Sequence, residues 1–196
     1  MKILKIVLSL LMFLSFSYAD EVKQPLTFEL KDIKGNVYHI TNTDDGMEIK
    51  ELKGKVVFIA FFGHRCPPCR MEIPGFIEYT KDKEYAKKST ILALEVQGLQ
   101  RSYVEEFAKN NGINYPLIPG EENYNFINYV GYRTQWNNAI PFMVVLDQNG
   151  KVVNFGNGIV SPEELKSIVD ELNPSIIEDI DKNIDNNITK WTHKGG

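Results

Sequence analysis

The two cysteines of the chain, Cys66 and Cys69, are separated only by two prolines. A disulfide between them would close a very small ring, which constrains little of the unfolded chain and therefore stabilises a fold poorly. The pair follows an apolar run and stands where a helix is expected to begin. This spacing at such a place favours a bond that opens and closes during thiol–disulfide exchange.

The position of Cys66 explains why its sulfur would be reactive. At an exposed helix start, free backbone N–H groups and the positive end of the helix dipole stabilise a thiolate. A thiolate is the form that attacks a disulfide, so Cys66 is the expected nucleophile. Cys69, one turn further along, is the expected resolving thiol, and Arg65 adds positive charge beside the pair.

Two other uses of the cysteines are disfavoured. A zinc site would need two more ligands, and the chain offers only His39, His64 and His193 with no second cysteine pair. An inert structural disulfide is disfavoured by the small ring. No metal and no cofactor are therefore expected.

The first nineteen residues differ from the rest. Two lysines precede an apolar run of eleven residues, and Ala19 closes a short small-residue segment. This pattern predicts a secretory signal peptide over residues 1–19, cleaved after Ala19. The run is shorter than the ~20 residues that span a bilayer; an uncleaved anchor, the alternative, would tie the protein to a membrane. Export to the periplasm places the cysteines where disulfides persist.

Composition and charge limit the remaining possibilities. The chain has 196 residues, 43% of them hydrophobic, which suits one domain with a sizeable core. Its formal net charge is −4 and it has no basic cluster, so nucleic acid is not an expected partner. The domain is predicted over residues 20–172. Residues 173–196 are predicted to form an amphipathic helical extension that packs on the domain, or else a frayed or partner-facing tail.

The pattern of apolar residues predicts an α/β fold with a mixed central sheet, helices on both faces and an N-terminal β-hairpin. A loop is expected over 41–55, and one helix from the cysteines to about Lys87, bent at Pro74. The other expected elements are a hairpin over 26–40, strands over 55–62 and 89–98, a helix over 100–112, a hairpin over 142–156 and a helix over 161–172.

Several stretches together resemble the thioredoxin superfamily, and more narrowly its exported TlpA/ResA-type thiol–disulfide oxidoreductases. The matching stretches, spread over about residues 26–172, are LTFELKDIKGN, ELKGKVVFIAFFGHRCPPCRMEIP, FAKNNGINYPLI and IPFMVVLDQNGKVV. The most specific is CPPCRMEIP.

The resemblance implies roles for five residues. Cys66 takes the attacking position and Cys69 the resolving one. Glu72 matches a glutamate of this subgroup that would be partly buried and would carry a proton to or from the resolving thiol. Ile140 and Pro141 match a cis-proline loop that lies against the disulfide and binds substrate backbone.

The chain also departs from the family pattern. Many relatives have tryptophan-rich flanks where this chain has His64 and Arg65, and thioredoxin has a buried aspartate where this chain has Ala60. His64 either tunes the Cys66 thiolate or is a solvated surface histidine. Tyr132 and Trp136 either form a substrate-facing rim or belong to the core.

The resemblance implies a periplasmic enzyme that reduces disulfides in substrate proteins and is recharged by a membrane thiol–disulfide electron donor. Apocytochrome c, with its own C-x-x-C-H thiols, is a candidate substrate. The alternatives are a disulfide oxidase or isomerase, a thiol peroxidase of the same fold, and a non-enzymatic binding adaptor. The peroxidase is disfavoured because FFGHRC lacks a threonine three residues before the first cysteine.

Overall fold

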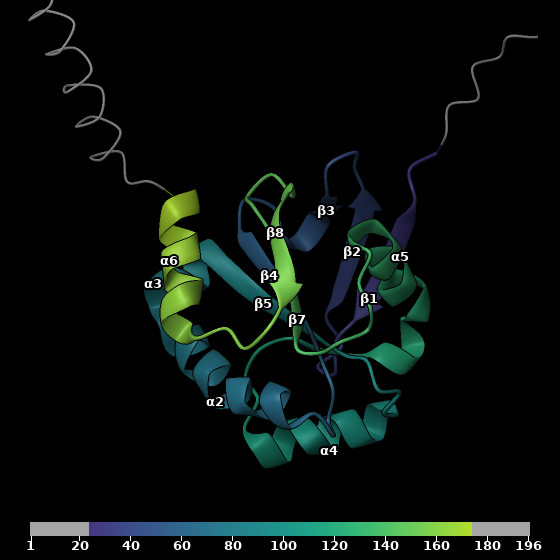
Figure 1. Ribbon diagram of the computed structural model, residues 1–196, viewed down its shortest axis with the longest axis vertical. Coiled ribbons are helices and arrows are strands. Elements are labelled where there is room, and N and C mark those ends of the chain that lie inside the picture. The colour runs from purple at the N-terminus through teal and green to yellow at the C-terminus, as the bar shows by residue number, and fades with distance from the viewer. Residues whose placement is uncertain (1–23, 174–196) are drawn as a thin grey trace, which may run out of the picture.

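The computed structural model describes residues 24–173, which build an α/β domain around a five-stranded sheet (Figure 1). The strand order is β6-β5-β4-β7-β8. Strands β4, β5 and β6 run parallel, whereas β7 pairs antiparallel with β4, and β8 antiparallel with β7. The sheet is therefore mixed, as the sequence predicts. The strands are Leu117–Pro119 (β6), Ser89–Glu95 (β5), Val56–Phe62 (β4), Phe142–Leu146 (β7) and Val152–Asn157 (β8).

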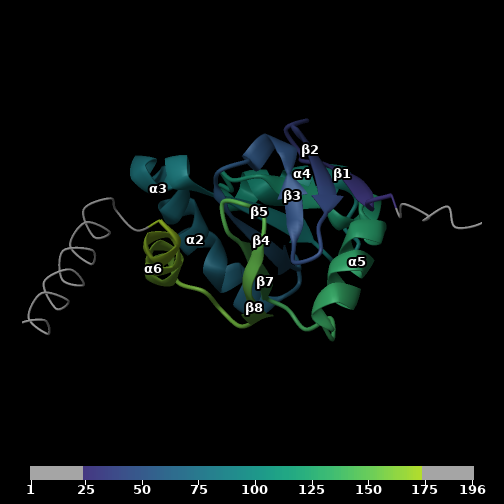
Figure 2. The same ribbon diagram turned by 90° about the horizontal axis from the view of Figure 1, so that it is seen from above.

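Strand β4 divides the interior into two cores because all seven of its residues are buried and successive side chains point to opposite faces. Residues of α2, α4 and α6 pack in the core on one face, and residues of α5 and an N-terminal sheet pack in the core on the other. Figure 2 shows α2 and α6 on one side of the central sheet and α5 with the N-terminal sheet on the other. The covering helices are Pro67–Lys81 (α2), Arg101–Asn111 (α4), Tyr124–Thr134 (α5) and Pro162–Leu172 (α6).

The N-terminal sheet contains three antiparallel strands, β1 (Thr27–Lys31), β2 (Val37–Asn42) and β3 (Met47–Ile49). The predicted hairpin is present as β1 and β2, with Gly35 at φ 88° in its turn. The predicted loop over 41–55 was wrong at β3, which pairs with β2. Three residues are too few to display the alternation that marks a strand.

The helix predicted to run from the cysteines to about Lys87 is divided in two. It ends as α2 and restarts as α3 (Lys83–Lys88), and the break lies at Asp82, whose carboxylate accepts a hydrogen bond of 3.1 Å from the Glu84 N–H. Pro74 lies inside α2. An aspartate at this position competes for backbone N–H groups and begins a new helix, which the apolar periodicity alone does not reveal.

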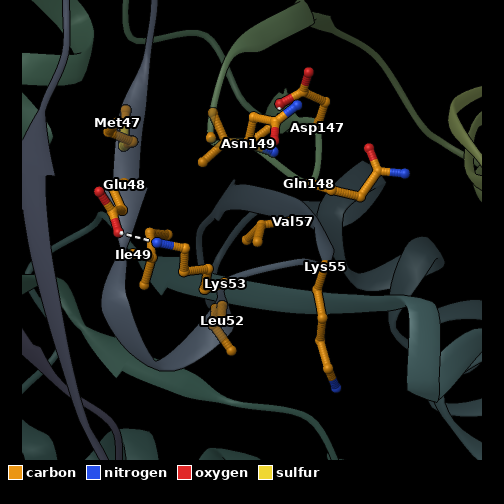
Figure 3. Close-up of a pocket in the computed structure, with 12 residues that line it drawn as sticks. Met47, Glu48, Ile49, Leu52, Lys53, Lys55, Val57, Asp147, Gln148 and Asn149 are labelled. Carbon is orange, nitrogen blue, oxygen red and sulfur yellow. Dashed lines mark hydrogen bonds and ion pairs between the residues drawn. The ribbon is translucent and has the colours of Figure 1, made fainter.

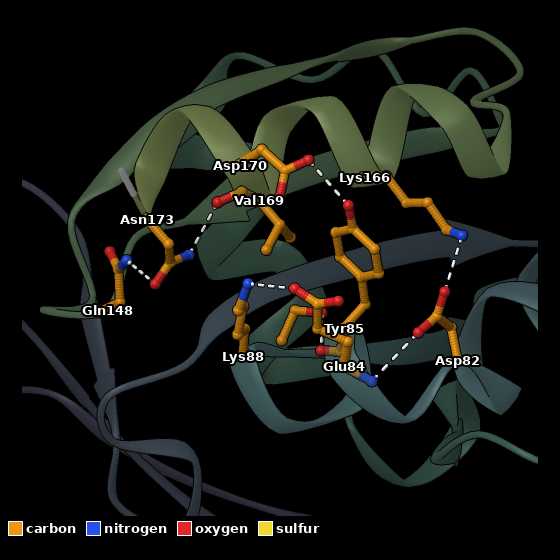
Figure 4. Close-up of polar contacts among 10 residues, drawn as sticks. Asp82, Glu84, Tyr85, Lys88, Gln148, Lys166, Val169, Asp170 and Asn173 are labelled. Carbon is orange, nitrogen blue, oxygen red and sulfur yellow. Dashed lines mark hydrogen bonds and ion pairs between the residues drawn. The ribbon is translucent and has the colours of Figure 1, made fainter. Parts of the chain in front are cut away.

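Side chains of α3 and α6 hold the two helices together (Figure 4). Lys166 Nζ lies 2.8 Å from an Asp82 carboxylate oxygen, and the Tyr85 hydroxyl donates to Asp170 over 2.8 Å. Helix α6 begins with a capping box between Ser161 and Glu164. These contacts fix where α6 begins, close to the site described next.

Candidate active site

Three segments that are distant in sequence meet at one edge of the central sheet. Strands β4 and β5 run parallel, so their carboxyl ends lie at the same edge, where Phe62 pairs with Glu95. Strand β7 runs the other way, so it begins at that edge, with Phe142 opposite Phe61. The cysteines follow β4 and Pro141 precedes β7. The fold therefore brings the two predicted parts of the site together.

Cys66 and Cys69 form a disulfide with their Cα atoms 5.3 Å apart. Cys66 is the N-cap of α2, and its sulfur accepts a hydrogen bond of 3.2 Å from the Cys69 N–H. Pro67 and Pro68 occupy the first turn, where no intrahelical N–H donor is needed. The Cys66 sulfur therefore lies at the positive end of the helix dipole, as the sequence predicts.

The two sulfurs differ in exposure. Cys66 is 6% exposed and Cys69 is 1% exposed, so both are buried and Cys66 is the less deeply buried of the two. Cys66 is nevertheless less open than a helix-tip position predicts. The cause is the loop before β7, because the carbonyl oxygen of Ile140 lies 3.7 Å from the Cys66 sulfur. The sulfur of a disulfide carries no hydrogen, so this is a packing contact.

The bond between Ile140 and Pro141 is cis, the isomer that the family resemblance implied. Trp136 contacts both ends of this loop. Its indole N–H donates to the Ala139 carbonyl over 2.7 Å, and its ring stacks on Phe142 with centroids 5.2 Å apart. Trp136 is thus half-buried and packs on the core that α5 and the N-terminal sheet cover. This agrees with the interpretation that placed Trp136 in the core.

Tyr132, which shared the rim interpretation with Trp136, lies on the outer side of α5 and is 84% exposed. Its ring therefore does not belong to the core. No contact of the described residues connects it with the disulfide.

Glu72 lies one turn after Cys69 on α2 and is buried, with 5% of the residue exposed. Burial disfavours the charged form and raises the pKa of Glu72 to about 7, although the Val160 N–H, which donates to its carboxylate over 2.8 Å, acts in the opposite direction. Glu72 is thus a buried carboxyl that titrates near neutral pH, within one helical turn of the resolving cysteine.

Glu95 is a functional candidate that the sequence analysis missed. It ends β5, is fully buried, and accepts a hydrogen bond of 2.8 Å from the ring of His64. His64 is therefore not a solvated histidine; its side chain is 16% exposed. A glutamate closing an otherwise apolar strand, STILALE, was the available signal, because a buried carboxylate requires partners.

A pocket lined by Met47, Lys53 and Val57 lies at the opposite edge of the sheet, where β4 begins and β7 ends (Figure 3). None of the cysteines, Glu72 or Pro141 lines it, so it is separate from the disulfide. Among residues 24–173 no cluster of three or more His, Cys, Asp or Glu side chains is arranged to hold a metal ion. Within the same residues no helix is long and apolar enough to cross a membrane.

The chain matches the AhpC/TSA family over residues 23–155. This match covers more than half of the chain. The chain belongs to the AhpC/TSA family.

Curated members identify the kind of enzyme. The chain is 32% identical over 130 residues to the thiol–disulfide oxidoreductase ResA of Bacillus cereus, which covers 65% of this chain and 69% of the relative. It is 25% identical over 159 residues to ResA of Halalkalibacterium halodurans, covering 81% and 80%. This AhpC/TSA family member is a thiol–disulfide oxidoreductase of the ResA kind, and Cys66–Cys69 is its CXXC disulfide.

Solved structures agree with the fold. A thiol:disulfide interchange protein from Chlorobium tepidum is 27% identical, with a TM-score of 0.60 over 79% of this chain and 99% of that one. StoA from Bacillus subtilis, at 22% identity and a TM-score of 0.55, covers 73% of this chain and 96% of its own. The predicted thioredoxin-like fold is confirmed. The predicted signal peptide and C-terminal extension lie outside the described residues.

Proposed function

We propose that the enzyme works in the periplasm as a reductant of disulfides in exported proteins, with apocytochrome c as the candidate substrate. The observation that carries the exchange chemistry is the position of the disulfide one helical turn from Glu72, a buried carboxyl whose pKa is raised to about 7. The reducing direction is supported by the family resemblance. An exchange reaction must move protons as well as electrons, and a group titrating near neutrality can take up and release a proton at that pH.

The proposed reaction begins from the reduced pair. The Cys66 thiolate attacks one sulfur of a substrate disulfide, forms a mixed disulfide and releases the other substrate sulfur as a thiolate. Cys69 then passes its proton to Glu72 and attacks the Cys66 sulfur. The Cys66–Cys69 bond forms and the second substrate sulfur leaves. Two electrons have passed to the substrate, and its two thiolates take up protons, one of them from Glu72.

Substrate binding is assigned to the loop of Ile140 and Pro141. The Ile140 carbonyl is in contact with the Cys66 sulfur, so an extended substrate backbone lying along this loop would bring its own sulfur close to Cys66. The oxidised enzyme must then be reduced by an external dithiol protein, which for an exported enzyme would be a membrane electron donor. Residues 1–19 support export, and the expected mature chain begins at Asp20.

The direction of electron flow is tested by the midpoint potential of the Cys66–Cys69 pair together with turnover. A reductant should have a potential near the reducing end of the range from roughly −270 to −120 mV. It should also reduce a peptide with an oxidised C-x-x-C-H segment faster than it oxidises the reduced peptide. A potential near the oxidising end, with faster oxidation, would make the enzyme an oxidase. Consumption of hydrogen peroxide by the reduced protein would instead support a peroxidase.

A further inference from the structure

The loop that leads into Cys66 is held by a fully buried carboxylate. Glu95 accepts hydrogen bonds at one oxygen from the His64 ring over 2.8 Å and from the Gln97 N–H over 3.1 Å. Its other oxygen accepts from the Leu99 N–H over 2.9 Å. All these donors are N–H groups, which is the set of partners that suits an ionised carboxylate. Burying such a group is costly unless every partner is present.

The contacts continue from Glu95 through His64 to Arg65. The Arg65 Nε–H donates to His64 Nε2 over 3.0 Å, while His64 Nδ1 faces Glu95. Since Nε2 accepts, the ring is the neutral tautomer that carries its proton on Nδ1. The Arg65 N–H also donates to the Gln97 side chain over 2.8 Å. Both the backbone and the Nε of Arg65 are therefore fixed by the end of β5.

This arrangement fixes one edge of the Arg65 guanidinium and leaves the other free. Within residues 24–173 the terminal amino groups of Arg65 make no hydrogen bond and no ion pair, and the residue is exposed. Two such amino groups form the fork that binds a carboxylate in a bidentate manner. The next residue is the nucleophile Cys66, whose Cα lies about 3.8 Å along the chain.

The loop before Cys66 would keep its position without the contact between His64 and Arg65. The Gln97 side chain and the backbone bond from Cys66 N–H to the Gly63 carbonyl, 3.1 Å, already hold the loop. The additional contact orients a charge. The whole chain has a formal net charge of −4, so its overall electrostatic field does not attract acidic partners. Attracting an acidic partner therefore needs a fixed positive charge near the site.

We propose that Arg65, held by His64 and Glu95, is a docking cation that selects substrates with an acidic side chain beside their reactive cysteine. Arg65 would contact the substrate, whereas His64 and Glu95 are positioning residues that act through Arg65. Fixing the guanidinium beforehand lowers the entropy lost when the substrate carboxylate binds. The proposal rests on the reductase function proposed above and adds a substrate class to it.

The test uses three peptides with the same disulfide that differ only in the residue before one cysteine, which is Glu, Gln or Lys. The readout is the ratio of kcat/KM for the Glu peptide to that for the Lys peptide, because a ratio cancels changes in the reactivity of the thiol itself. The reduced enzyme should prefer the Glu peptide about 10-fold at low salt. The preference should fall to about 2-fold near 0.5 M salt.

Variants of Arg65 test substrate docking, and variants of His64 and Glu95 test the positioning of Arg65. Arg65→Gln should lower the ratio to about 1, and Arg65→Lys, which keeps the charge but lacks the fork, should give about 3-fold. His64→Asn and Glu95→Gln should reduce the preference to about 3-fold while the charge of Arg65 remains. The matched control is Lys53→Gln, an equal change of charge at the opposite edge of the sheet, which should keep the full preference.

Two results would overturn the proposal in different ways. Equal, measurable rates for the three peptides, or a preference that persists in Arg65→Gln, would reject the docking cation and leave the reductase function standing. Absence of reduction of all three peptides by the unaltered enzyme would reject both. Because Arg65 is exposed, its variants should fold, and their rate ratios test the proposal even if His64→Asn or Glu95→Gln does not fold.

Discussion

At the scale of single residues, the burial of Glu72 gives its carboxyl a pKa suited to proton transfer, at a cost in stability when the carboxyl is ionised. A carboxyl with a folded-state pKa of about 7 and an ordinary value of 4.5 is harder to ionise in the folded protein than in the unfolded one. The folded state therefore binds this proton more tightly. The stability that results is complete below about pH 4.5 and is lost as the pH rises through about 7.

Replacing Glu72 by Gln should consequently stabilise the oxidised protein at alkaline pH. The amide oxygen can still accept from the Val160 N–H, and no charge has to be buried. Urea unfolding at pH 8 should give a gain of about 1 to 3 kcal/mol over the unaltered protein, and the gain should vanish near pH 4. An equal gain at both pH values would mean that Glu72 titrates normally.

The same substitution should slow the resolving step. Without Glu72 as base, Cys69 must lose its proton to water, so decay of the mixed disulfide at pH 7 should slow at least about 10-fold. The difference should close above about pH 9, where thiols ionise unaided. Stopped-flow measurement with Glu78→Gln, an exposed glutamate of the same helix, is the control. Identical pH profiles for the Glu72 and Glu78 variants would contradict the proton-carrying role.

At the scale of elements, the start of α6 matters for the site because Val160, the partner of Glu72, directly precedes the capping residue Ser161. Ser161 accepts from the Glu164 N–H over 3.2 Å, and Glu164 accepts from the Ser161 N–H over 2.7 Å. The capping box thus fixes the backbone beside Val160, whose N–H donates to the buried carboxyl of Glu72.

Ser161→Ala should therefore cost about 1 kcal/mol of unfolding free energy, the usual loss for a helix cap. The matched control is Ser102→Ala in α4, where the serine is exposed and does not cap, and where alanine should be neutral or slightly stabilising. Denaturant midpoints of the two variants make the comparison. The cap contributes nothing if both variants unfold at the same denaturant concentration.

At the scale of the whole molecule, the three-stranded sheet is joined to the central sheet at a close backbone contact. Gly46 bridges to Lys151, and a Cβ built on Gly46 would lie 2.1 Å from the Gly150 carbonyl oxygen. No side chain fits between these backbones, so the two sheets approach each other only because residue 46 is a glycine.

Gly46→Ala should separate this contact and destabilise the domain by more than about 1 kcal/mol. Gly156→Ala in β8 is the control, because a Cβ there meets nothing within 4 Å. Thermal unfolding of both variants tests the claim. Equal melting temperatures would show that the contact between the sheets is dispensable.

Long or strongly patterned elements were predictable from the sequence, and short ones were not. The strand expected over 55–62 and the helix expected over 161–172 were recognised correctly because burial and helix capping leave local signals. Strand β3, strand β6 and helix α5 were missed. Two are three residues long, and α5 is a helix rich in Asn, Tyr and Gly that owes its place to packing.

The site shows the same division. The spacing of the cysteines predicted the disulfide, whereas Glu72 and Pro141 were assigned by family resemblance. Glu95 comes from another strand, and only the parallel pairing of β4 with β5 brings it to His64. The glutamate at the end of the apolar strand signals a buried carboxylate, but strand register supplies its partner His64, and a single sequence does not reveal that pairing.

The most direct test of the account is to mix reduced Cys69→Ala with a peptide disulfide and to determine the mass of the product. The account predicts a lasting mixed disulfide on Cys66, since no resolving thiol remains, whereas Cys66→Ala should form almost none because Cys69 is more deeply buried and does not lie at the helix N-cap. A stable adduct on Cys69 in the Cys66→Ala protein, with none on Cys66 in the other variant, would contradict the assignment of the attacking sulfur.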